Sequence, residues 1–504
     1  MTPSPAPPVP LPELVPSLWA DLAAAGFTVD GIAAALGPVV NDALGREQML
    51  PADLATRGVG TPVATLVRLF TLGRPVPADA VAAALPTLGV EGLQRLGLVT
   101  TGEDGVRATC DLHPHADETH SWWVASDLSE MATGAALAPD HVLGIGGAST
   151  TLAAWTPRPQ VDRALDMGTG CGVQALHLSG HTGSIVATDL SRRALDFAAF
   201  NAGVNGLELD LRCGSLFEPV AGQRFQLIVS NPPFVITPRV ADVPLFEYRD
   251  GGLAGDALVE AVVRTIGEHL EPGGIGQFLG NWEVAEGADW RDRVRGWLEG
   301  TGLDAWVIQR DVQDPAQYAE LWARDGGNVP GTPEYEAMYA AWLADFATRG
   351  VGSVGFGVVT VQRPATARDT WVELVEESGP VSSPMGPAIL AGVRARTWLA
   401  EHGDAGVLAT AWRCAGDVTE ERHSRPGAED PSVIVIRQGS GLRRGVRVDT
   451  VMAAFVSVCD GGDLTAGQVL EAIAALLEQD PAEVRSAALP VVRELVADGF
   501  LLPA

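Results

Sequence analysis

A glycine-rich segment at residues 166–172 is the first part of the chain whose residue types suit ligand binding. Residues 166–172 read Asp-Met-Gly-Thr-Gly-Cys-Gly and follow an apolar run that predicts a buried strand. Glycines at alternate positions let the backbone turn tightly and approach a ligand closely. A dinucleotide-binding fingerprint would need glycine at position 173, where the chain has Val173. The segment therefore predicts a close-approach loop that departs from the dinucleotide pattern.

Polar residues at the ends of the following strands point to a nucleoside ligand. Asp189 ends the next predicted strand, 23 residues after Asp166. An acidic side chain at that place can accept hydrogen bonds from both ribose hydroxyls. Ligands of doubly wound folds lie at the carboxyl ends of the strands, where we expect the glycine-rich loop, Asp189, Ser215 and Asn231 to meet.

The tetrapeptide Asn231-Pro232-Pro233-Phe234 follows the fourth predicted strand and is suited to binding a planar NH2 group. The nitrogen of an amide or exocyclic amine is a poor nucleophile because its lone pair is delocalised. The Asn231 side-chain oxygen and the Pro232 carbonyl can each accept one N–H, which would orient that nitrogen for displacement. Phe234 would stack on the planar group.

Together these residues resemble the class I S-adenosylmethionine-dependent methyltransferases of the Asn-Pro-Pro-Phe, small-domain type. That group includes protein-(glutamine-N5), ribosomal RNA guanine-N2 and adenine-N6 methyltransferases, and the resemblance spans roughly residues 140–285. It implies S-adenosyl-L-methionine as the cofactor and Asn231, Pro232, Pro233 and Phe234 as the catalytic residues. The cofactor-binding residues that it implies are Asp166, Gly168, Thr169, Gly170, Gly172, Asp189, Leu190, Ser215, Leu216 and Asn231.

Neighbouring segments resemble the protein-glutamine branch of this group. Residues 216–219 read Leu-Phe-Glu-Pro and residues 249–252 read Arg-Asp-Gly-Gly, with Gly-Asp at 255–256. One position departs from that branch, because Ser215 stands where an aspartate usually contacts the adenine amino group. The loop 146–151 has the position of the family segment that covers the methionine end of the cofactor, but not its sequence.

The favoured methyl acceptor is therefore a protein glutamine side chain. A formal net charge of −29 also favours this acceptor, because an acidic protein repels phosphate backbones. The alternative is a ribosomal or transfer RNA base, guanine-N2 or adenine-N6, with the additional terminal domains docking the RNA. A small-molecule or peptide methyltransferase and a non-catalytic cofactor-binding assembly protein are less favoured.

The alternation of strand and helix patterns over residues 140–363 predicts an α/β fold, with a Rossmann-like, seven-stranded class I methyltransferase domain. An insert at about 312–350 holds three of the four tyrosines. We expect its aromatic side chains to pack the insert on the sheet, with a substrate lid as the alternative. The aromatic residues concerned are Tyr318, Trp322, Tyr335, Tyr339, Trp342 and Phe346.

Composition shifts divide the chain into four predicted parts. Residues 1–10 are a flexible Pro-rich tail, 11–135 a helical domain with a winged-helix-like unit, 136–365 the methyltransferase domain, and 366–504 a C-terminal domain that also ends in a winged-helix-like unit. A hairpin near the start of that last unit is the most basic short stretch of the chain. It could contact RNA or an acidic partner, or it could be a solvated turn. Its basic residues are Arg437, Arg443, Arg444 and Arg447.

Several partner classes are disfavoured by the sequence. No uninterrupted apolar run reaches about 20 residues and no signal-peptide pattern opens the chain, so we expect a cytoplasmic protein without membrane contact. The five cysteines are scattered, which argues against a disulfide framework or a zinc ribbon. His113, His115 and His120 lie close in sequence, but Pro114 and the lack of a fourth ligand argue against a metal site. The oligomeric state cannot be inferred.

Overall fold

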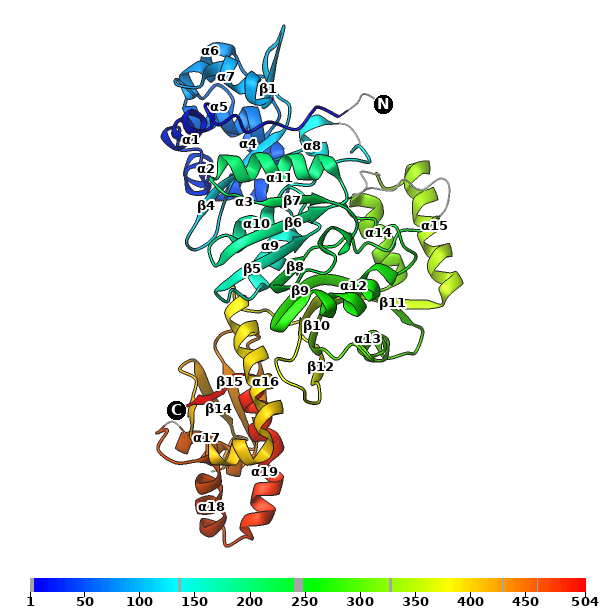
Figure 1. Cartoon of the computed structure of the whole chain (residues 1–504). Helices are drawn as coiled ribbons and strands as arrows, with labels where there is room; N and C mark the ends of the chain where they lie inside the picture. The colour runs from blue at the N-terminus through cyan, green and yellow to red at the C-terminus, as the bar shows by residue number, and fades with distance from the viewer. Residues whose placement is uncertain (1–3, 135–136, 240–247, 326–328, 428–429, 460) are drawn as a thin grey trace.

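The protein consists of three parts that follow one another along an elongated molecule (Figure 1). A computed structural model describes residues 4–134, 137–239, 248–325, 329–427, 430–459 and 461–504. Helices and two small hairpins form the N-terminal part, a large sheet with flanking helices forms the centre, and the C-terminal part combines helices with small sheets.

The central sheet has eight strands in the order β12-β10-β11-β9-β8-β5-β6-β7. Strands β5 to β9 run parallel, and β11 pairs antiparallel with both β9 and β10. Their bounds are β5 (Val161–Met167), β6 (Thr182–Asp189), β7 (Asp210–Cys213), β8 (Phe225–Ser230), β9 (Leu270–Ala285), β10 (Asp304–Gln313), β11 (Val351–Gln362) and β12 (Val372–Glu376).

The seven predicted strands are all present, which confirms the α/β class. An eighth strand, β12, was not predicted. Its residues fall in the range assigned to the C-terminal domain, but they pair parallel with β10 at the edge of the central sheet. Its sequence, Val-Glu-Leu-Val-Glu, places its two glutamates on opposite faces of the strand, because they are three residues apart. The central sheet therefore extends past residue 365.

The strand register brings the predicted site residues to one edge of the sheet. Met167 pairs with both Thr188 and Ser230, and Asp189 pairs with Cys213. Because β5, β6, β7 and β8 are parallel, the loops after them all leave the sheet at its carboxyl edge. The glycine-rich loop, Asp189, Ser215 and Asn231 are therefore neighbours.

Helices cover both faces of the sheet. The apolar sides of α12 (Ala257–Thr265) and α13 (Trp290–Leu298) share one core with the sheet. On the other face α9 (Gly147–Trp155), α10 (Val173–Leu178) and the start of the long helix α16 (Gly386–Ala409) form a second core. The methyltransferase-like centre is thus a three-layer α/β structure.

The N-terminal part shares a single hydrophobic core with the central part. That core joins residues such as Phe27 and Phe70 to Phe197 and Phe200 of α11 (Arg192–Val204), which Figure 1 shows between the N-terminal part and the sheet. The N-terminal helices are α1 (Val15–Ala24), α2 (Val29–Leu36), α3 (Pro38–Gly45), α4 (Met49–Thr56), α5 (Pro62–Leu66), η1 (Val67–Thr71), α6 (Ala78–Ala84), α7 (Gly89–Leu96) and α8 (Glu130–Thr133). Its strands are β1 (Val99–Gly102), β2 (Gly105–Ala108), β3 (Asp111–Ala116) and β4 (Ser121–Ser126).

Helices α6 and α7 followed by the hairpin β1–β2 have the order expected for a winged-helix-like unit, which stays a prediction. The segment Val15–Leu36 is the one stretch in the described part of the chain that is long and apolar enough to pass as a membrane span. It is formed by two helices, α1 and α2, and Gly26 between them has a left-handed φ of 67°. Each helix is shorter than the roughly 20 residues that span a bilayer.

The Pro-rich segment was predicted to be a flexible tail, but residues 4–10 make defined contacts. Ser4 donates to Asp140 at 2.9 Å, and the carbonyl of Pro5 accepts from Arg193 at 2.6 Å. The backbone N–H of Val9 donates to the carbonyl of Leu96 at 2.9 Å. An extended Pro-rich chain leaves its carbonyls available as acceptors, and these partners become apparent only in the folded protein.

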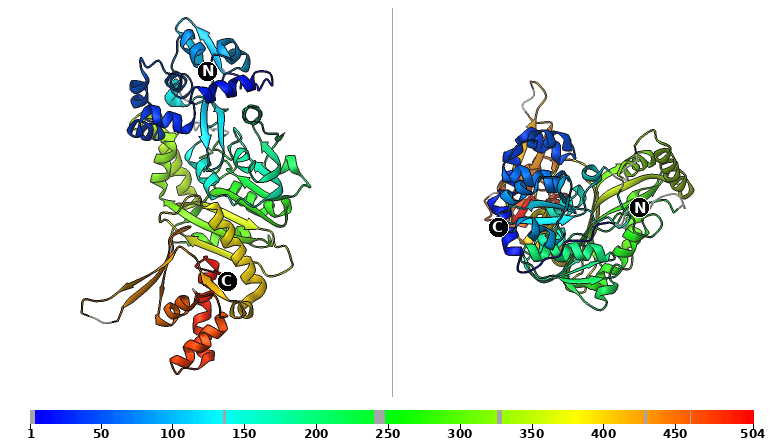
Figure 2. Two further views of the ribbon diagram at one scale, coloured as in Figure 1. Left: turned by 90° about the vertical axis from the view of Figure 1, so that its left-hand side faces the viewer. Right: turned by 90° about the horizontal axis from the view of Figure 1, so that it is seen from above.

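The C-terminal part combines α16 with α17 (Thr450–Cys459), α18 (Ala466–Leu476) and α19 (Pro481–Ala497). Its strands are β13 (Trp412–Cys414), β14 (Val418–His423), β15 (Val433–Gln438), β16 (Gly445–Val448) and β17 (Leu501–Pro503). Figure 2 shows the β14–β15 hairpin reaching away from the body.

The basic hairpin predicted from the sequence is formed by β15 and β16, and most of its arginines have partners within the protein. Arg437 forms an ion pair with Glu421, and Arg444 pairs with Asp498. Arg443 donates to the Ser382 hydroxyl at 3.1 Å. These contacts neutralise two of the four charges, which weakens the prediction of an RNA contact at this hairpin.

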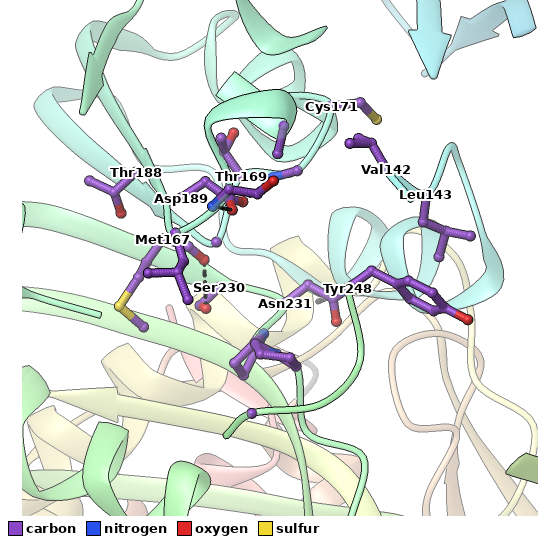
Figure 3. A pocket seen from close by; sticks show the side chains of 18 of the residues that line it. Val142, Leu143, Met167, Thr169, Cys171, Thr188, Asp189, Ser230, Asn231 and Tyr248 are labelled. Atoms are coloured by element: carbon purple, nitrogen blue, oxygen red, sulfur yellow. Dashed lines mark hydrogen bonds between the residues drawn. The ribbon is translucent and has the colours of Figure 1, made fainter. Parts of the chain in front are cut away.

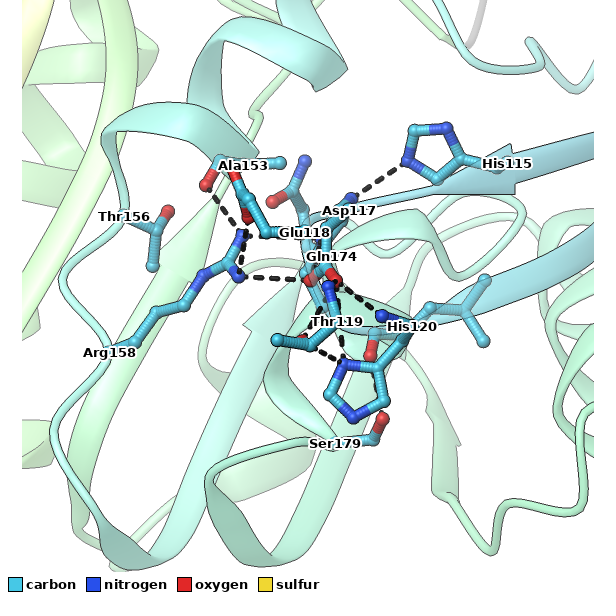
Figure 4. Close-up of polar contacts among 12 residues, drawn as sticks. His115, Asp117, Glu118, Thr119, His120, Ala153, Thr156, Arg158, Gln174 and Ser179 are labelled. Atoms are coloured by element: carbon cyan, nitrogen blue, oxygen red, sulfur yellow. Dashed lines mark hydrogen bonds and ion pairs between the residues drawn. The ribbon is translucent and has the colours of Figure 1, made fainter. Parts of the chain in front are cut away.

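His115 and His120 lie where the β3–β4 hairpin meets the central part (Figure 4). His115 shares a hydrogen bond of 2.9 Å with His177 of α10. Beside them, the Asp117 carboxylate accepts from Arg158 at 3.0 Å and from the backbone N–H groups of Thr119 and His120. These residues join the two parts. Within the described ranges, no group of three potential ligands could hold a metal ion.

Candidate functional site

A cavity of about 280 Å³ opens at the carboxyl ends of β5, β6 and β8. Figure 3 shows the Asp189 and Thr169 side chains at one end of it and Asn231 near Tyr248 at the other. The cavity is lined by predicted residues from each of the strand-end loops. These are Gly168, Thr169, Gly170, Asp189, Leu190, Ser215, Leu216, Asn231, Pro232 and Pro233.

The glycine-rich loop is held against the end of β6 by its own backbone. Gly168, Gly170 and Gly172 have left-handed φ angles of 72°, 55° and 90°, which L side chains rarely adopt. The N–H groups of Gly168 and Thr169 donate to the Thr188 carbonyl at 2.8 and 2.9 Å. The sequence prediction of a tight loop with close ligand approach agrees with this geometry.

Asp166 supports this loop through hydrogen bonds but does not line the cavity. Its Oδ2 accepts from the Thr169 hydroxyl at 2.6 Å and from the Ala175 N–H at 2.9 Å. Its Oδ1 is buried and has no hydrogen-bond partner among the described residues. Complete burial raises the pKa of Asp166 to about 7. Of the residues predicted to bind cofactor, Asp166 and Gly172 are therefore placed behind the cavity wall.

Asp189 is positioned by backbone groups on both sides. Its Oδ2 accepts from the Gly170 N–H at 2.9 Å and its Oδ1 from the Ser191 N–H at 2.8 Å. Each carboxylate oxygen can accept more than one hydrogen bond, so both can still accept from a ligand hydroxyl. The next residue, Leu190, is 71% exposed at the rim of the cavity. This arrangement fits the predicted ribose-binding role.

Asn231 holds an available acceptor at the cavity. Its Oδ1 is buried, and no described residue donates a hydrogen bond to it. A buried acceptor without a partner costs about 1–3 kcal/mol, so such groups often mark functional sites. A ligand N–H would remove this cost. Oδ1 therefore fits the role predicted for it.

Phe234 does not line the cavity as the predicted stacking residue should. It is half-buried and packs against three hydrophobic cores at once. It also forms a bridge with Asp250, and the neighbouring Val235 N–H donates to the Arg249 carbonyl at 3.0 Å. The Arg-Asp-Gly-Gly segment thus runs beside the Asn-Pro-Pro-Phe turn, and Phe234 anchors that turn instead of facing a ligand.

The insert helices α14 (Pro315–Asp325) and α15 (Pro333–Arg349) hold the chain just after this turn. The Ile236 N–H donates to the Tyr318 hydroxyl at 2.8 Å, and Trp342 Nε1 donates to the Ile236 carbonyl at 2.7 Å. Tyr318, Trp342 and Phe346 are buried in one core with residues 235 and 236. This agrees with the predicted packing role of the insert aromatics, and it also gives them a part in positioning the turn.

The sequence did not reveal several residues that line the cavity. Tyr248 lies near Asn231 in Figure 3, and its hydroxyl donates to Asp325 at 3.2 Å. Val142 and Leu143 form another wall. The signal for Tyr248 was an aromatic residue directly before the Arg-Asp-Gly-Gly segment. Val142 and Leu143 carried no signal, because apolar residues in a connecting loop have no distinctive pattern.

Three family matches cover different parts of the chain. Residues 144–243 match the family described as methyltransferase small domain. Residues 24–109 and residues 391–503 match two families that are each described as a domain of unknown function. The methyltransferase small domain match thus contains the glycine-rich loop, Asp189 and Asn231 of the cavity.

Curated relatives match part of the chain. A ribosomal protein uL3 glutamine methyltransferase of Bradyrhizobium diazoefficiens is 38% identical over 125 residues, which are 23% of this chain and 39% of the relative. A release factor glutamine methyltransferase of Xylella fastidiosa is 37% identical over 30% of this chain and 56% of the relative. A ribosomal RNA small subunit methyltransferase C of Salmonella arizonae is 29% identical over 27% of this chain and 35% of the relative.

Each of these matches spans less than two thirds of the relative's length. The matched region contains the glycine-rich loop, Asp189 and the Asn-Pro-Pro-Phe turn, which surround the cavity. The family match, the named relatives and the strand order agree on its type. Residues 144–243 of this chain match the methyltransferase small domain, and part of the chain is similar to named glutamine and ribosomal RNA methyltransferases.

Proposed function

We propose that this protein is a methyltransferase that transfers the methyl group of S-adenosylmethionine to the side-chain amide of a protein glutamine. The observation that carries the proposal is at Asn231, which lines the cavity and whose buried Oδ1 has no hydrogen-bond partner among the described residues. An acceptor fixed in this way matches an N–H of a planar NH2 group. The small-domain match and the relatives support the same chemistry.

The cavity residues fit S-adenosylmethionine in their chemistry. Asp189 supplies two carboxylate acceptors for ribose hydroxyls, and the left-handed glycines allow a ligand to approach the backbone of the loop closely. Ser215 lines the cavity where the related enzymes carry an aspartate, and its hydroxyl can accept one hydrogen bond from the adenine amino group. When bound, the cofactor supplies an electrophilic methyl group on a positively charged sulfur.

The protein's own residues would orient the acceptor nitrogen. Asn231 Oδ1 and the Pro232 carbonyl would each accept one of its two N–H bonds, which turns the lone pair toward the cofactor. The turn is held rigidly by Phe234 and by the bonds of Tyr318 and Trp342 to residue 236. A preorganised acceptor pair contributes to catalysis because it needs no rearrangement in the transition state. As the nitrogen–methyl bond forms, the sulfur–methyl bond would break and leave a neutral thioether. No strong general base is required, because the nitrogen then becomes acidic and can release its proton to water.

A protein acceptor is favoured over RNA by electrostatics. The chain carries a net charge of −29, and the arginines of its most basic hairpin are largely engaged with Glu421, Asp498 and Ser382. An RNA partner would need a patch of free positive charge. A ribosomal RNA base is the second candidate, and the relative named ribosomal RNA small subunit methyltransferase C supports it.

The test is transfer of a tritiated methyl group from S-adenosylmethionine by the purified protein. The acceptor is a lysate of a strain of the source organism that lacks the gene, and the product is treated with either ribonuclease or protease. We expect label that resists ribonuclease and is lost with protease, and a peptide with one methylated glutamine in mass spectrometry. Label lost with ribonuclease would reject the glutamine proposal in favour of RNA. Absence of S-adenosylmethionine binding in calorimetry would reject the activity itself.

A further inference from the structure

Strand β4 of the N-terminal part is completed on one edge by two side chains from the central part. One edge of β4 pairs with β3, and its other edge faces α11. Asn205 accepts from the Trp123 N–H at 3.0 Å and donates to the Trp123 carbonyl at 2.8 Å. Asn201 does the same with Ala125, at 2.7 and 2.9 Å. The two amides, one helical turn apart, take the place of a neighbouring strand.

Asn201 makes one contact that Asn205 does not make. Its Nδ2 also donates to the backbone carbonyl of Cys171 at 2.7 Å. Cys171 lies in the glycine-rich loop and lines the cavity, between two glycines with left-handed φ angles. The Asn201 side chain is 0% exposed, so no water replaces these bonds. A single amide therefore joins the N-terminal strand to the loop.

A second contact from the same part of the chain reaches another residue that lines the cavity. Asp127 directly follows β4, and its N–H donates to the Val142 carbonyl at 3.1 Å. Its Oδ2 accepts from the Val142 N–H at 2.9 Å and from Arg193 Nε at 3.0 Å. Val142 lines the cavity. The chain around β4 thus holds both the glycine-rich loop and the Val142 wall.

Strand β4, which is linked to the glycine-rich loop and to Val142 by these contacts, is itself anchored in the hydrophobic core of the N-terminal part. Trp123 donates from Nε1 to the Phe27 carbonyl at 2.7 Å, and both are buried in the core that joins the N-terminal helices to α11. In contrast, three glycines make the loop 168–172 costly to order, because glycine loses more conformational freedom than other residues. Bonds that fix the loop before ligand binding reduce the entropy lost on binding.

We propose that Asn201 is a positioning residue for the cofactor, and that it couples the N-terminal domain to cofactor affinity through the Cys171 carbonyl. This inference rests on the proposed function, because it takes S-adenosylmethionine as the ligand. It assigns to the N-terminal part a role in shaping the cofactor site, in addition to any contact with a methyl acceptor.

The matched variants Asn201→Asp and Asn205→Asp test this proposal in the full-length protein. Each removes the two N–H donors of one amide and places a carboxylate oxygen against two backbone carbonyls. These belong to Ala125 and Cys171 for Asn201→Asp, and to Trp123 and Asn201 for Asn205→Asp. Both therefore disturb the same interface, but only Asn201→Asp removes the bond to the loop. The dissociation constant of S-adenosylmethionine is measured by calorimetry, and hydrogen exchange of the amides at 170–173 is followed by mass spectrometry without ligand.

We expect Asn201→Asp to raise the dissociation constant about tenfold and to speed exchange at 170–173, since the loop must then be ordered by the ligand. Asn205→Asp should stay within about twofold of the wild type in both measurements, even where its melting temperature falls equally. If Asn201→Asp does not fold, Asn201→Ser at low temperature replaces it, because a hydroxyl cannot span both Ala125 and Cys171.

The two variants also separate this proposal from the proposed function. Equal affinities and equal exchange for the two variants would overturn the positioning role, whereas a wild-type protein that does not bind S-adenosylmethionine would overturn the proposed function. In that second case the exchange rates at 170–173 still decide whether Asn201 orders the loop.

Discussion

The Asp189 carboxylate and the Gly170 backbone are joined by a hydrogen bond of 2.9 Å, from the Gly170 N–H to Oδ2. This bond links the end of β6 to the glycine-rich loop after β5, so that one side chain both orders the loop and presents acceptors to a ligand. The other oxygen accepts from the Ser191 N–H at the start of α11.

Asp189→Ala should weaken the binding of S-adenosylmethionine by about tenfold or more. The change removes the acceptor for Gly170 as well as the acceptors expected for the ribose, and hydrogen bonds to charged groups contribute about 1.5–3 kcal/mol each. Calorimetry measures the dissociation constant. Asp210→Ala, which removes an exposed carboxylate at the start of β7 outside the cavity, is the control and should bind as the wild type does. Equal affinity of the Asp189 variant would remove its ribose role.

Asn231→Ala should retain cofactor binding within about twofold but lower turnover by about 100- to 1000-fold, the usual effect of removing one preorganised transition-state partner. The matched variant Asn231→Asp keeps an oxygen at Oδ1 and should retain more turnover than the alanine variant. Single-turnover methyl transfer at saturating S-adenosylmethionine measures both. Turnover that is the same for alanine and aspartate would mean that the Oδ1 acceptor takes no part in the reaction.

The sequence predicted the central fold because its signals are local. Buried parallel strands such as β8 are rich in apolar residues, and the loops after them are marked by glycine, aspartate or asparagine. Parallel strands place these loops at one edge, so Gly170, Asp189 and Asn231 could be brought together without any knowledge of packing.

Features that depend on distant contacts were not predicted. The role of Asn201 requires α11, β4 and the glycine-rich loop to meet, and an asparagine within a helix gives no sign of this. The inward packing of Phe234 depends on the insert, which lies roughly 80–110 residues further along the chain. Strand β12 pairs with β10 across a gap of nearly 60 residues, and its short sequence lacks the period of two that marks a strand.

The stability of the ligand-free protein should depend on pH through Asp166. Burial raises the pKa of this carboxyl from an ordinary 3.8 to about 7. Because the folded-state pKa lies above the unfolded value, the folded state binds the proton more tightly. The resulting stabilisation is complete below about pH 4 and is lost as the pH rises through about 7. The melting temperature should therefore fall as the pH rises from about 4 to about 7 and should level off above that.

Asp166→Asn isolates this contribution, because the amide oxygen can still accept from Thr169 and Ala175. Asp111 also has a pKa raised to about 7 by burial, and it remains in the variant. We therefore expect the melting temperature of the variant minus that of the wild type to increase with pH across this window. If the melting temperatures of the variant and the wild type change with pH in parallel, Asp166 does not titrate in this window.

Tyr318→Phe should destabilise the protein by about 1–3 kcal/mol, because it leaves the Ile236 N–H and the Asn281 side-chain N–H buried without their acceptor. Urea unfolding followed by tryptophan fluorescence measures the loss. Tyr335→Phe makes the same change at a half-buried ring that stacks on Tyr339 in the same insert, and should stay within about 0.5 kcal/mol.

The same tyrosine variant also tests whether the insert positions the catalytic turn. Ile236 lies two residues after Phe234, so loss of its bond to Tyr318 should let the Asn-Pro-Pro-Phe turn move while leaving Asp189 and the glycine-rich loop in place. Turnover of Tyr318→Phe should then fall severalfold at an unchanged S-adenosylmethionine dissociation constant. A proportional loss of turnover and of cofactor affinity would instead indicate a general loosening of the fold, because the cofactor-binding loops have no hydrogen bond to Tyr318 among the described residues.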